Sequence, residues 1–131
     1  MTRRELREHI FKLLFFVEFH ENEELPKQIA LYFNELGEVS ERNHTYMEAK
    51  YEHVKEKLSE IDGILDKVTE GWKTVRMSKV DLTLLRLAVY EMNFDDDIPV
   101  GVAINEAVEL AKLFGGEDSS AFVNGVLAKL T

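Results

Sequence analysis

The chain has 131 residues, of which 45% are hydrophobic and 31% charged, a balance typical of a globular domain and not of a disordered tail. It contains no cysteine, which excludes a disulfide framework, a thiolate metal site and a cysteine nucleophile. The formal net charge of −9 argues against general nucleic-acid binding, because an acidic surface repels phosphates unless basic side chains are concentrated locally. We expect a single domain over residues 1–131.

The N-terminal half carries apolar residues at helical spacing. Residues 3–20 predict a first helix with two apolar faces, one of them a phenylalanine stripe at Phe11, Phe15 and Phe19. Pro26 suits the first turn of a second helix, which Gly37 ends, and residues 38–44 read as a polar connection. The apolar positions from residue 47 to residue 65 predict a long third helix, with Gly63 as the point where it could bend or split.

The C-terminal half predicts three further helices. Ser78 is a suitable N-cap for a helix over residues 79–93, and Pro99 opens the next helix, which ends at Gly115 and Gly116. Alanines at positions 103, 107 and 111 form a small-residue stripe, and we expect Asn105 and Gly125 to be packing positions as well. The last helix begins near Asp118, and no alternating strand pattern competes. The predicted fold is all-α, a compact single-domain bundle of six or seven helices.

No constellation of residues points to catalysis or to metal binding. The four histidines lack the i, i+4 pairing of a helical zinc site, and the acidic run at residues 95–97 lacks the ligand spacing of a calcium loop. Gly115 and Gly116 follow no strand and precede no suitably placed lysine, so a helix end is favoured over a phosphate loop. We expect no enzyme activity, no cofactor and no metal. The charged N-terminus lacks an apolar segment suited to export or membrane spanning, which favours a cytoplasmic protein.

The basic side chains are unevenly distributed. Residues 3–12 carry four basic and two acidic side chains, whereas residues 81–131 carry three basic and nine acidic ones. On a helical wheel Arg4 and Arg7 extend the phenylalanine stripe, an arrangement in which arginines hold phosphates while bases stack on aromatic rings. The same arginines could only solubilise the helix, and the phenylalanines could be core or a dimer contact. From these residues alone an RNA partner and a protein partner both remain open.

Three motifs in the last third of the chain resemble a known family. They are the block at residues 81–91 (DLTLLRLAVYE), the run at residues 105–112 (NEAVELAK) and the segment at residues 122–125 (FVNG), in that order and at the family's spacing. Together they resemble the bacterial transcription antitermination factor NusB family. The resemblance extends from residue 3 to residue 127, and it is weaker through the middle of the chain.

The resemblance implies an all-helical protein that binds the boxA sequence of ribosomal RNA leaders. Family members do so with a small-subunit ribosomal protein, NusE, and help RNA polymerase to read past terminators. The family's arginine-rich motif matches here, with a departure at Glu5, where many members carry a basic residue. The RNA-binding residues implied are Arg3, Arg4, Arg7, Phe15 and Phe122.

The resemblance places the contact with the ribosomal protein around the helix that contains Asp81 and the turn before it. An acidic patch there would suit a strongly basic partner, since complementary charge speeds docking and fixes register. Trp72 and Arg76 are candidate anchors of this contact, because both residue types are enriched at binding hot spots. In the alternative reading, Trp72 packs over a helix junction and Arg76 bonds a helix end.

Two other functions are compatible with parts of the sequence. A NusB-like domain also begins certain ribosomal RNA cytosine methyltransferases, but those enzymes need an α/β domain and catalytic cysteines that this sequence lacks. The second is a helical protein-interaction adaptor without RNA binding of its own, which Glu5 and the net charge keep open. The sequence leaves open whether the protein is a monomer or a homodimer.

Overall fold

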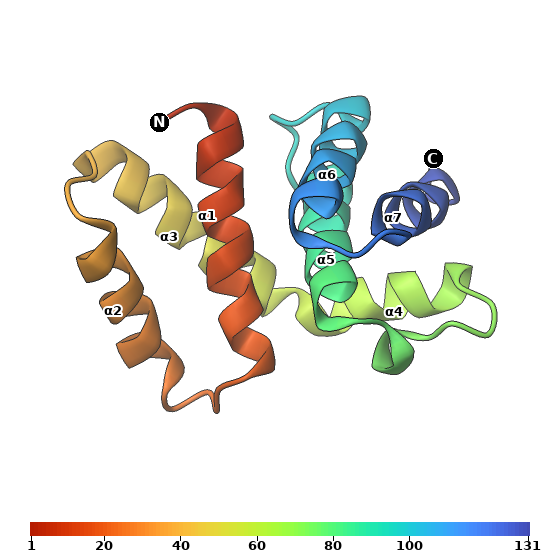
Figure 1. Ribbon diagram of the computed structural model, residues 1–131, viewed down its shortest axis with the longest axis horizontal. Coiled ribbons are helices and arrows are strands. Elements are labelled where there is room, and N and C mark those ends of the chain that lie inside the picture. The colour runs from red at the N-terminus through yellow and green to blue at the C-terminus, as the bar shows by residue number, and fades with distance from the viewer. The chain divides into compact units, whose positions relative to one another are not determined.

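The computed structural model describes residues 1–131, and every regular element in it is helical (Figure 1). The predicted all-α class is therefore confirmed, with seven α-helices and two short 3-10 helices. The chain divides into two compact units, residues 1–55 and residues 56–131. That the whole chain acts as one domain stays a prediction.

The first unit contains three α-helices and one 3-10 turn. Their bounds are α1 (Arg3–Phe15), η1 (Phe16–Glu18), α2 (Leu25–Leu36) and α3 (Glu41–Glu56). The first α-helix is therefore shorter than the predicted span of residues 3–20. After Phe15 the chain continues as a 3-10 turn. The apolar face expected from the sequence is buried at Leu6, Ile10, Leu13 and Leu14.

The third helix differs from its prediction at both ends. It begins at Glu41 rather than after His44, because the hydroxyl of Ser40 accepts a hydrogen bond from the backbone N–H of Asn43 and so starts the helix earlier. It ends at Glu56, and Lys57 separates it from α4. Gly63, the predicted breaking point, lies inside a continuous helix. The apolar positions keep helical spacing across Lys57, so the pattern alone did not reveal the break.

The second unit contains the remaining helices. Their bounds are α4 (Leu58–Val68), η2 (Thr74–Arg76), α5 (Lys79–Phe94), α6 (Val100–Phe114) and α7 (Ser119–Ala128). The predicted N-cap is confirmed, since the Ser78 hydroxyl accepts from the backbone N–H of Asp81 at 3.1 Å. At the start of α7 the Ser119 hydroxyl instead accepts from the N–H of Gly116, which joins the helix to the preceding turn.

Helix α6 packs against both α5 and α7. Its alanine stripe at positions 103, 107 and 111 is buried, as predicted, and small side chains there let the neighbouring helices approach closely. The expectation for Asn105 and Gly125 was wrong. Both residues are exposed, and a Cβ atom added to Gly125 would meet nothing within 4 Å. They lie on the solvent faces of their helices. A sequence motif alone does not show whether a residue lies on such a face or in the core.

Replacing Ala107 by leucine should overpack the contacts of α6. Because the stripe is buried and closely packed, we expect Ala107→Leu to lower the free energy of unfolding by about 1–3 kcal/mol in urea denaturation. Ala49→Leu, at an exposed position of α3, is the matched control and should change stability little. Equal stabilities for the two variants would contradict close packing along the stripe.

Candidate nucleic-acid interface

The start of α1 carries two of the three predicted arginines at the surface. Arg3 and Arg4 are exposed, whereas Arg7 is only 7% exposed. A phosphate contact requires a reachable guanidinium, which Arg3 and Arg4 offer, whereas little of Arg7 reaches solvent. The sequence did not reveal this difference, because arginine is usually exposed wherever it lies on a helix.

Glu5, the residue that departs from the family pattern, has a structural role. Its carboxylate accepts from the backbone N–H of Thr2 at 3.0 Å, and the Thr2 hydroxyl accepts from the N–H of Glu5 at 3.1 Å. This reciprocal arrangement is a capping box, which satisfies two amides that the helix cannot pair internally. Hydrogen bonding to the Thr2 backbone, and then to its side chain, lowers the pKa of Glu5 below its usual value.

The phenylalanine stripe changes from core to surface along the chain. Phe11 is buried, Phe15 is half-buried and Phe19 is 57% exposed. The ring of Phe15 lies 5.9 Å from that of Phe11 and 4.9 Å, edge to face, from that of Phe19. Phe15 is therefore supported on both sides while part of it reaches solvent. Phe19 is an exposed aromatic side chain that the predicted site omitted, although the i, i+4 spacing had placed it in the stripe.

The second unit brings together three residues that the sequence had assigned to two different partners. Trp72 is 45% exposed, and its ring meets that of Phe122 edge to face at 6.4 Å. The guanidinium of Arg76 lies over the Trp72 ring, 5.2 Å from its centroid, a cation–π arrangement. Arg76 also donates to the backbone carbonyl of Gly71 at 3.4 Å. The predicted RNA residue Phe122 thus forms one aromatic and cationic cluster with two predicted protein-contact residues.

The connection between α4 and α5 holds this cluster in place. Gly71 adopts a φ of +70°, a left-handed conformation that favours glycine, and it turns the chain directly before Trp72. The carboxylate of Asp66 accepts from the N–H of Thr74 at 2.8 Å and from its hydroxyl at 3.3 Å. Lys129, just after α7, donates to the carbonyl of Val68 at 3.3 Å and so links α7 to the connection.

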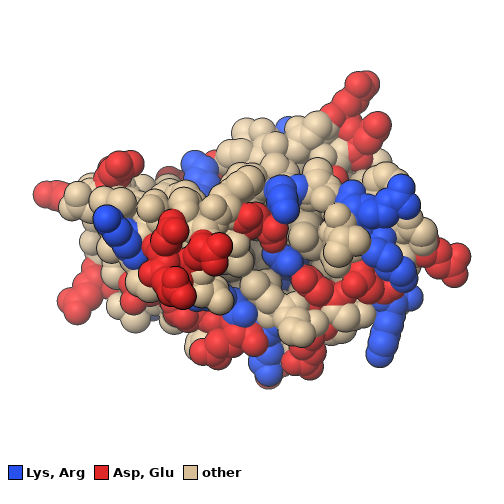
Figure 2. All heavy atoms as spheres, turned by 90° about the horizontal axis from the view of Figure 1, so that it is seen from below, with Lys and Arg blue, Asp and Glu red and all other residues tan.

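The same connection is rich in basic side chains. Residues 67–79 carry four basic side chains, Lys67, Lys73, Arg76 and Lys79, against one acidic side chain, Glu70. All four are exposed, and so is Lys129. Figure 2 shows Lys and Arg side chains gathered at the end of this unit that carries α4 and the connection. This local excess of positive charge was not predicted. Its residues lie outside the family motifs, since residues 67–79 precede the first motif and Lys129 follows the last one.

Asp81 lies in the first turn of α5 and is half-buried. One of its carboxylate oxygens, Oδ1, is buried and has no hydrogen-bond partner. Only part of this side chain is therefore available to a protein partner, and its negative charge also lies at the helix N-terminus, where the helix dipole favours it.

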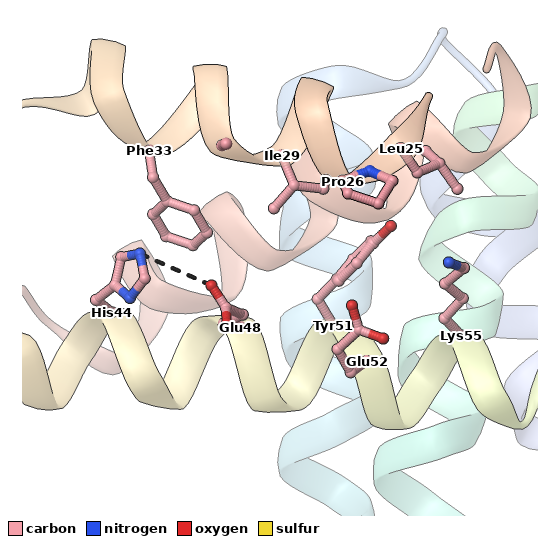
Figure 3. Close-up of a pocket in the computed structure, with 10 residues that line it drawn as sticks. Leu25, Pro26, Ile29, Phe33, His44, Glu48, Tyr51, Glu52 and Lys55 are labelled. Atoms are coloured by element: carbon pink, nitrogen blue, oxygen red, sulfur yellow. Dashed lines mark ion pairs between the residues drawn. The ribbon is translucent and has the colours of Figure 1, made fainter. Parts of the chain in front are cut away.

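A cavity of about 430 Å³ lies between α2 and α3 in the first unit (Figure 3). Leu25, Ile29 and Phe33 supply apolar walls, and His44 forms an ion-pair contact with Glu48 at 3.8 Å on the side of α3. None of the predicted site residues lines this cavity. Tyr51 is 1% exposed, its hydroxyl has no hydrogen-bond partner, and burial followed by the nearby Glu52 raises its pKa to about 12.

These observations first define a class. The protein is a small all-α chain with two surfaces that combine basic and aromatic side chains, one in each unit. No group of three or more histidine, aspartate or glutamate side chains is placed to hold a metal ion. None of the helices combines the length and the apolar character needed to cross a membrane.

Comparison with known proteins identifies the family. The NusB family model matches residues 4–131. A transcription antitermination protein NusB from Lachnoclostridium phytofermentans is 52% identical over 99% of this chain and 98% of its own length. One from Acetivibrio thermocellus is 43% identical over 99% of this chain and 88% of its own length. The chain belongs to the NusB family.

Solved structures agree with this assignment. A NusB structure from T. maritima superposes with a TM-score of 0.89 at 38% identity, covering 99% of this chain and 90% of that one. A second structure, described as antitermination factors NusB and NusE in complex with dsRNA, gives a TM-score of 0.79 at 26% identity, with 96% and 92% coverage. The predicted family, fold and role in transcription antitermination are confirmed by these matches. The individual contact residues stay predictions.

Removing the buried hydroxyl of Tyr51 tests whether the described packing is complete. An unpartnered buried hydroxyl costs desolvation without a compensating hydrogen bond, so Tyr51→Phe should leave the free energy of unfolding unchanged or raise it by up to about 1 kcal/mol. Urea denaturation measures this difference. A loss of stability well above 1 kcal/mol would show that the hydroxyl has a partner in solution.

Proposed function

We propose that this protein binds the boxA segment of ribosomal RNA leaders as a single strand, together with the small-subunit ribosomal protein NusE. The pair then supports read-through of terminators by RNA polymerase. The observation that carries the proposal is the exposed, basic and aromatic end of α1 in an otherwise acidic chain of the NusB family. A related structure is described as containing NusB, NusE and dsRNA, which supports both partners. The proposed role is binding, with no catalytic step, in the cytoplasm.

The RNA contact proposed for the first unit divides its residues by task. Arg3 and Arg4 neutralise phosphates, which releases counterions and supplies salt-dependent affinity. The partly exposed ring of Phe15 stacks on a base, a contact that tolerates any sequence because every base has a π face. Arg7, being buried, positions the helix start.

The protein contact is proposed at the start of α5, around Asp81. Ribosomal proteins are strongly basic, and the second unit is acidic beyond this point, with nine acidic and three basic side chains over residues 81–131. Opposite charge of this kind raises the association rate and disfavours wrong partners. Because Asp81 is half-buried, it offers a partner little contact area. Its contribution would be the electric field of its carboxylate, which helps to fix the position at which the partner docks.

The alternative is a helical adaptor that does not bind RNA. The observations favouring it are Glu5 and the net charge of −9. The capping box weakens the first of these, because Glu5 bonds the backbone of Thr2 and serves the helix start. The uneven distribution of charge weakens the second. Antitermination with RNA binding is therefore the better supported function.

The salt dependence of RNA binding tests the assignment of the arginines. Each phosphate contact with a single strand contributes about 0.7 to the slope of log K against log salt, so Arg3→Ala combined with Arg4→Ala should flatten the slope by about 1.4. The measurement is fluorescence anisotropy of a labelled single-stranded boxA RNA over a salt series. A duplex of the same sequence should bind more weakly, because its bases are not available for stacking.

The matched control is Lys27→Ala combined with Arg42→Ala. This variant removes the same amount of charge from exposed positions of α2 and α3, so it should lower affinity only slightly and leave the slope close to wild type. If the Arg3 and Arg4 variant binds with the affinity and slope of wild type, the proposed site at the start of α1 is wrong. If wild type binds no boxA RNA even with NusE present, the adaptor function replaces antitermination by RNA binding.

A further inference from the structure

The cavity between α2 and α3 is a groove whose wall on the α2 side is apolar. Leu25, Ile29 and Phe33 follow one another at helical spacing along α2, and Pro26 and Ala30 line the groove beside them. Because an α-helix rises 1.5 Å per residue, this wall is about 12 Å long. The volume of about 430 Å³ lies within the range of about 300–1,000 Å³ that is usual for ligand pockets. The groove can therefore receive apolar side chains of a ligand.

The wall on the α3 side is polar. It is lined by His44, Glu48, Glu52 and Lys55, which also follow the helical period (Figure 3). The ring of His44 lies 4.0 Å from that of Phe33, centroid to centroid, and this contact joins the two walls at one end of the groove. Glu48 and Glu52 are exposed and lie one helical turn apart. They place two carboxylates along the open edge of an apolar groove.

Tyr51 provides a hydrogen-bonding group inside the groove. Its side chain extends from α3 toward Leu25 and Pro26 on α2 (Figure 3), and the residue is only 1% exposed. Its hydroxyl has no hydrogen-bond partner. Buried polar groups without a partner are rare in folded proteins, and each one calls for an explanation. An oxygen atom of a ligand that enters the groove can accept a hydrogen bond from this hydroxyl.

The charge around the groove selects the kind of ligand. Residues 21–55 carry eight acidic and four basic side chains. All eight acidic side chains are exposed, whereas Lys50, one of the four basic residues, is only 5% exposed. An acidic surface of this kind repels a polyanion such as RNA and attracts a basic ligand. The ligand that fits both walls is therefore basic and also carries an apolar face.

We infer that this groove binds a basic amphipathic helix of a protein partner. The apolar side chains of that helix enter between α2 and α3, and its lysines or arginines contact Glu48 and Glu52. A helix docked in a groove presents its apolar side chains once per turn, at intervals of about 5.4 Å, which is also the spacing of Leu25, Ile29 and Phe33 along α2. This partner is additional to RNA and to NusE, whose proposed contacts lie at the starts of α1 and α5. The inference does not depend on either of them.

A synthetic peptide of known chemistry tests the groove on the full chain. The probe is a fluorescein-labelled peptide of about four helical turns, made only of leucine and lysine, with the leucines on one face of the helix. Its fluorescence anisotropy should rise to saturation at one peptide per chain, and the affinity should fall as salt is raised. A peptide with glutamate in place of every lysine should not bind, because it meets like charge.

Two identical substitutions at different places separate the groove from general charge attraction. Ala30 and Ala49 are both exposed helical positions, but only Ala30 lines the groove. Ala30→Arg puts bulk and positive charge into the groove and should weaken peptide binding about tenfold or more. Ala49→Arg adds the same charge to α3 outside the groove and should weaken binding by no more than about twofold. Circular dichroism of both variants should match that of wild type.

Removing carboxylates tests the proposed charge contacts. Glu48→Gln combined with Glu52→Gln should weaken binding of the leucine and lysine peptide about 2- to 30-fold, the effect of losing two exposed ion pairs. The matched control is Glu35→Gln combined with Glu38→Gln, which removes the same charge from exposed positions that do not line the groove. The control should bind the peptide nearly as tightly as wild type.

Equal peptide affinities for the Ala30→Arg and Ala49→Arg variants would overturn the inference, because the peptide would then attach by charge alone. A different occupant is also detectable. If wild type binds no peptide and sediments as a homodimer that Ala30→Arg dissociates, a second copy of the chain fills the groove and the inference is wrong. The variant with Arg3→Ala and Arg4→Ala should bind the peptide as wild type does, so a failure of the proposed RNA contact is distinguished from a failure of this one.

Discussion

An ion pair between Arg86 and Asp62 joins α5 to α4 in the second unit. The guanidinium donates to both carboxylate oxygens, at 2.9 Å and 2.8 Å, and both side chains are partly shielded from solvent. This two-point contact fixes α4 against α5 in one orientation, alongside the buried side chains of Ile61 and Leu65. The connection between these helices carries Trp72 and Arg76, so this pair fixes the two helices that the connection joins. Losing one partner would remove both hydrogen bonds of this pair and leave the other charged group partly shielded from solvent, which is costly.

Segregation of charge reconciles an acidic chain with a polyanionic ligand. A net charge of −9 would repel RNA if it were spread evenly, but exposed basic side chains outnumber acidic ones locally at the start of α1 and along the connection before α5. Acidic side chains dominate after residue 81, including the run at residues 95–97. Because exposed charges interact over about 8–10 Å at physiological salt, each group acts on its own surroundings. One protein can therefore present RNA and a basic protein with different surfaces.

The sequence predicted most of the fold because local rules and tertiary structure agree in α5, α6 and α7. Ser78 caps the helix it was expected to cap, and the buried alanines of α6 follow the helical period. The sequence did not reveal the break at Lys57, because the apolar spacing continues across it. Asn105 and Gly125 were expected in the core, because a family motif does not distinguish core positions from surface positions. For the site, the sequence predicted the kinds of residue involved, arginines and aromatic side chains. The burial of Arg7 and the meeting of Trp72 with Phe122, fifty positions apart, depend on tertiary packing.

The central claim is that RNA binds the basic and aromatic start of α1 while NusE binds the start of α5 around Asp81. Mapping backbone amide chemical shifts of the wild-type protein, first with single-stranded boxA RNA and then with NusE added, tests it most directly. RNA should perturb the start of α1 and the surroundings of Phe15, with no change at residues 95–97. NusE should then perturb the start of α5 around Asp81. RNA-induced changes centred on residues 95–97, with the start of α1 unperturbed, would contradict the claim.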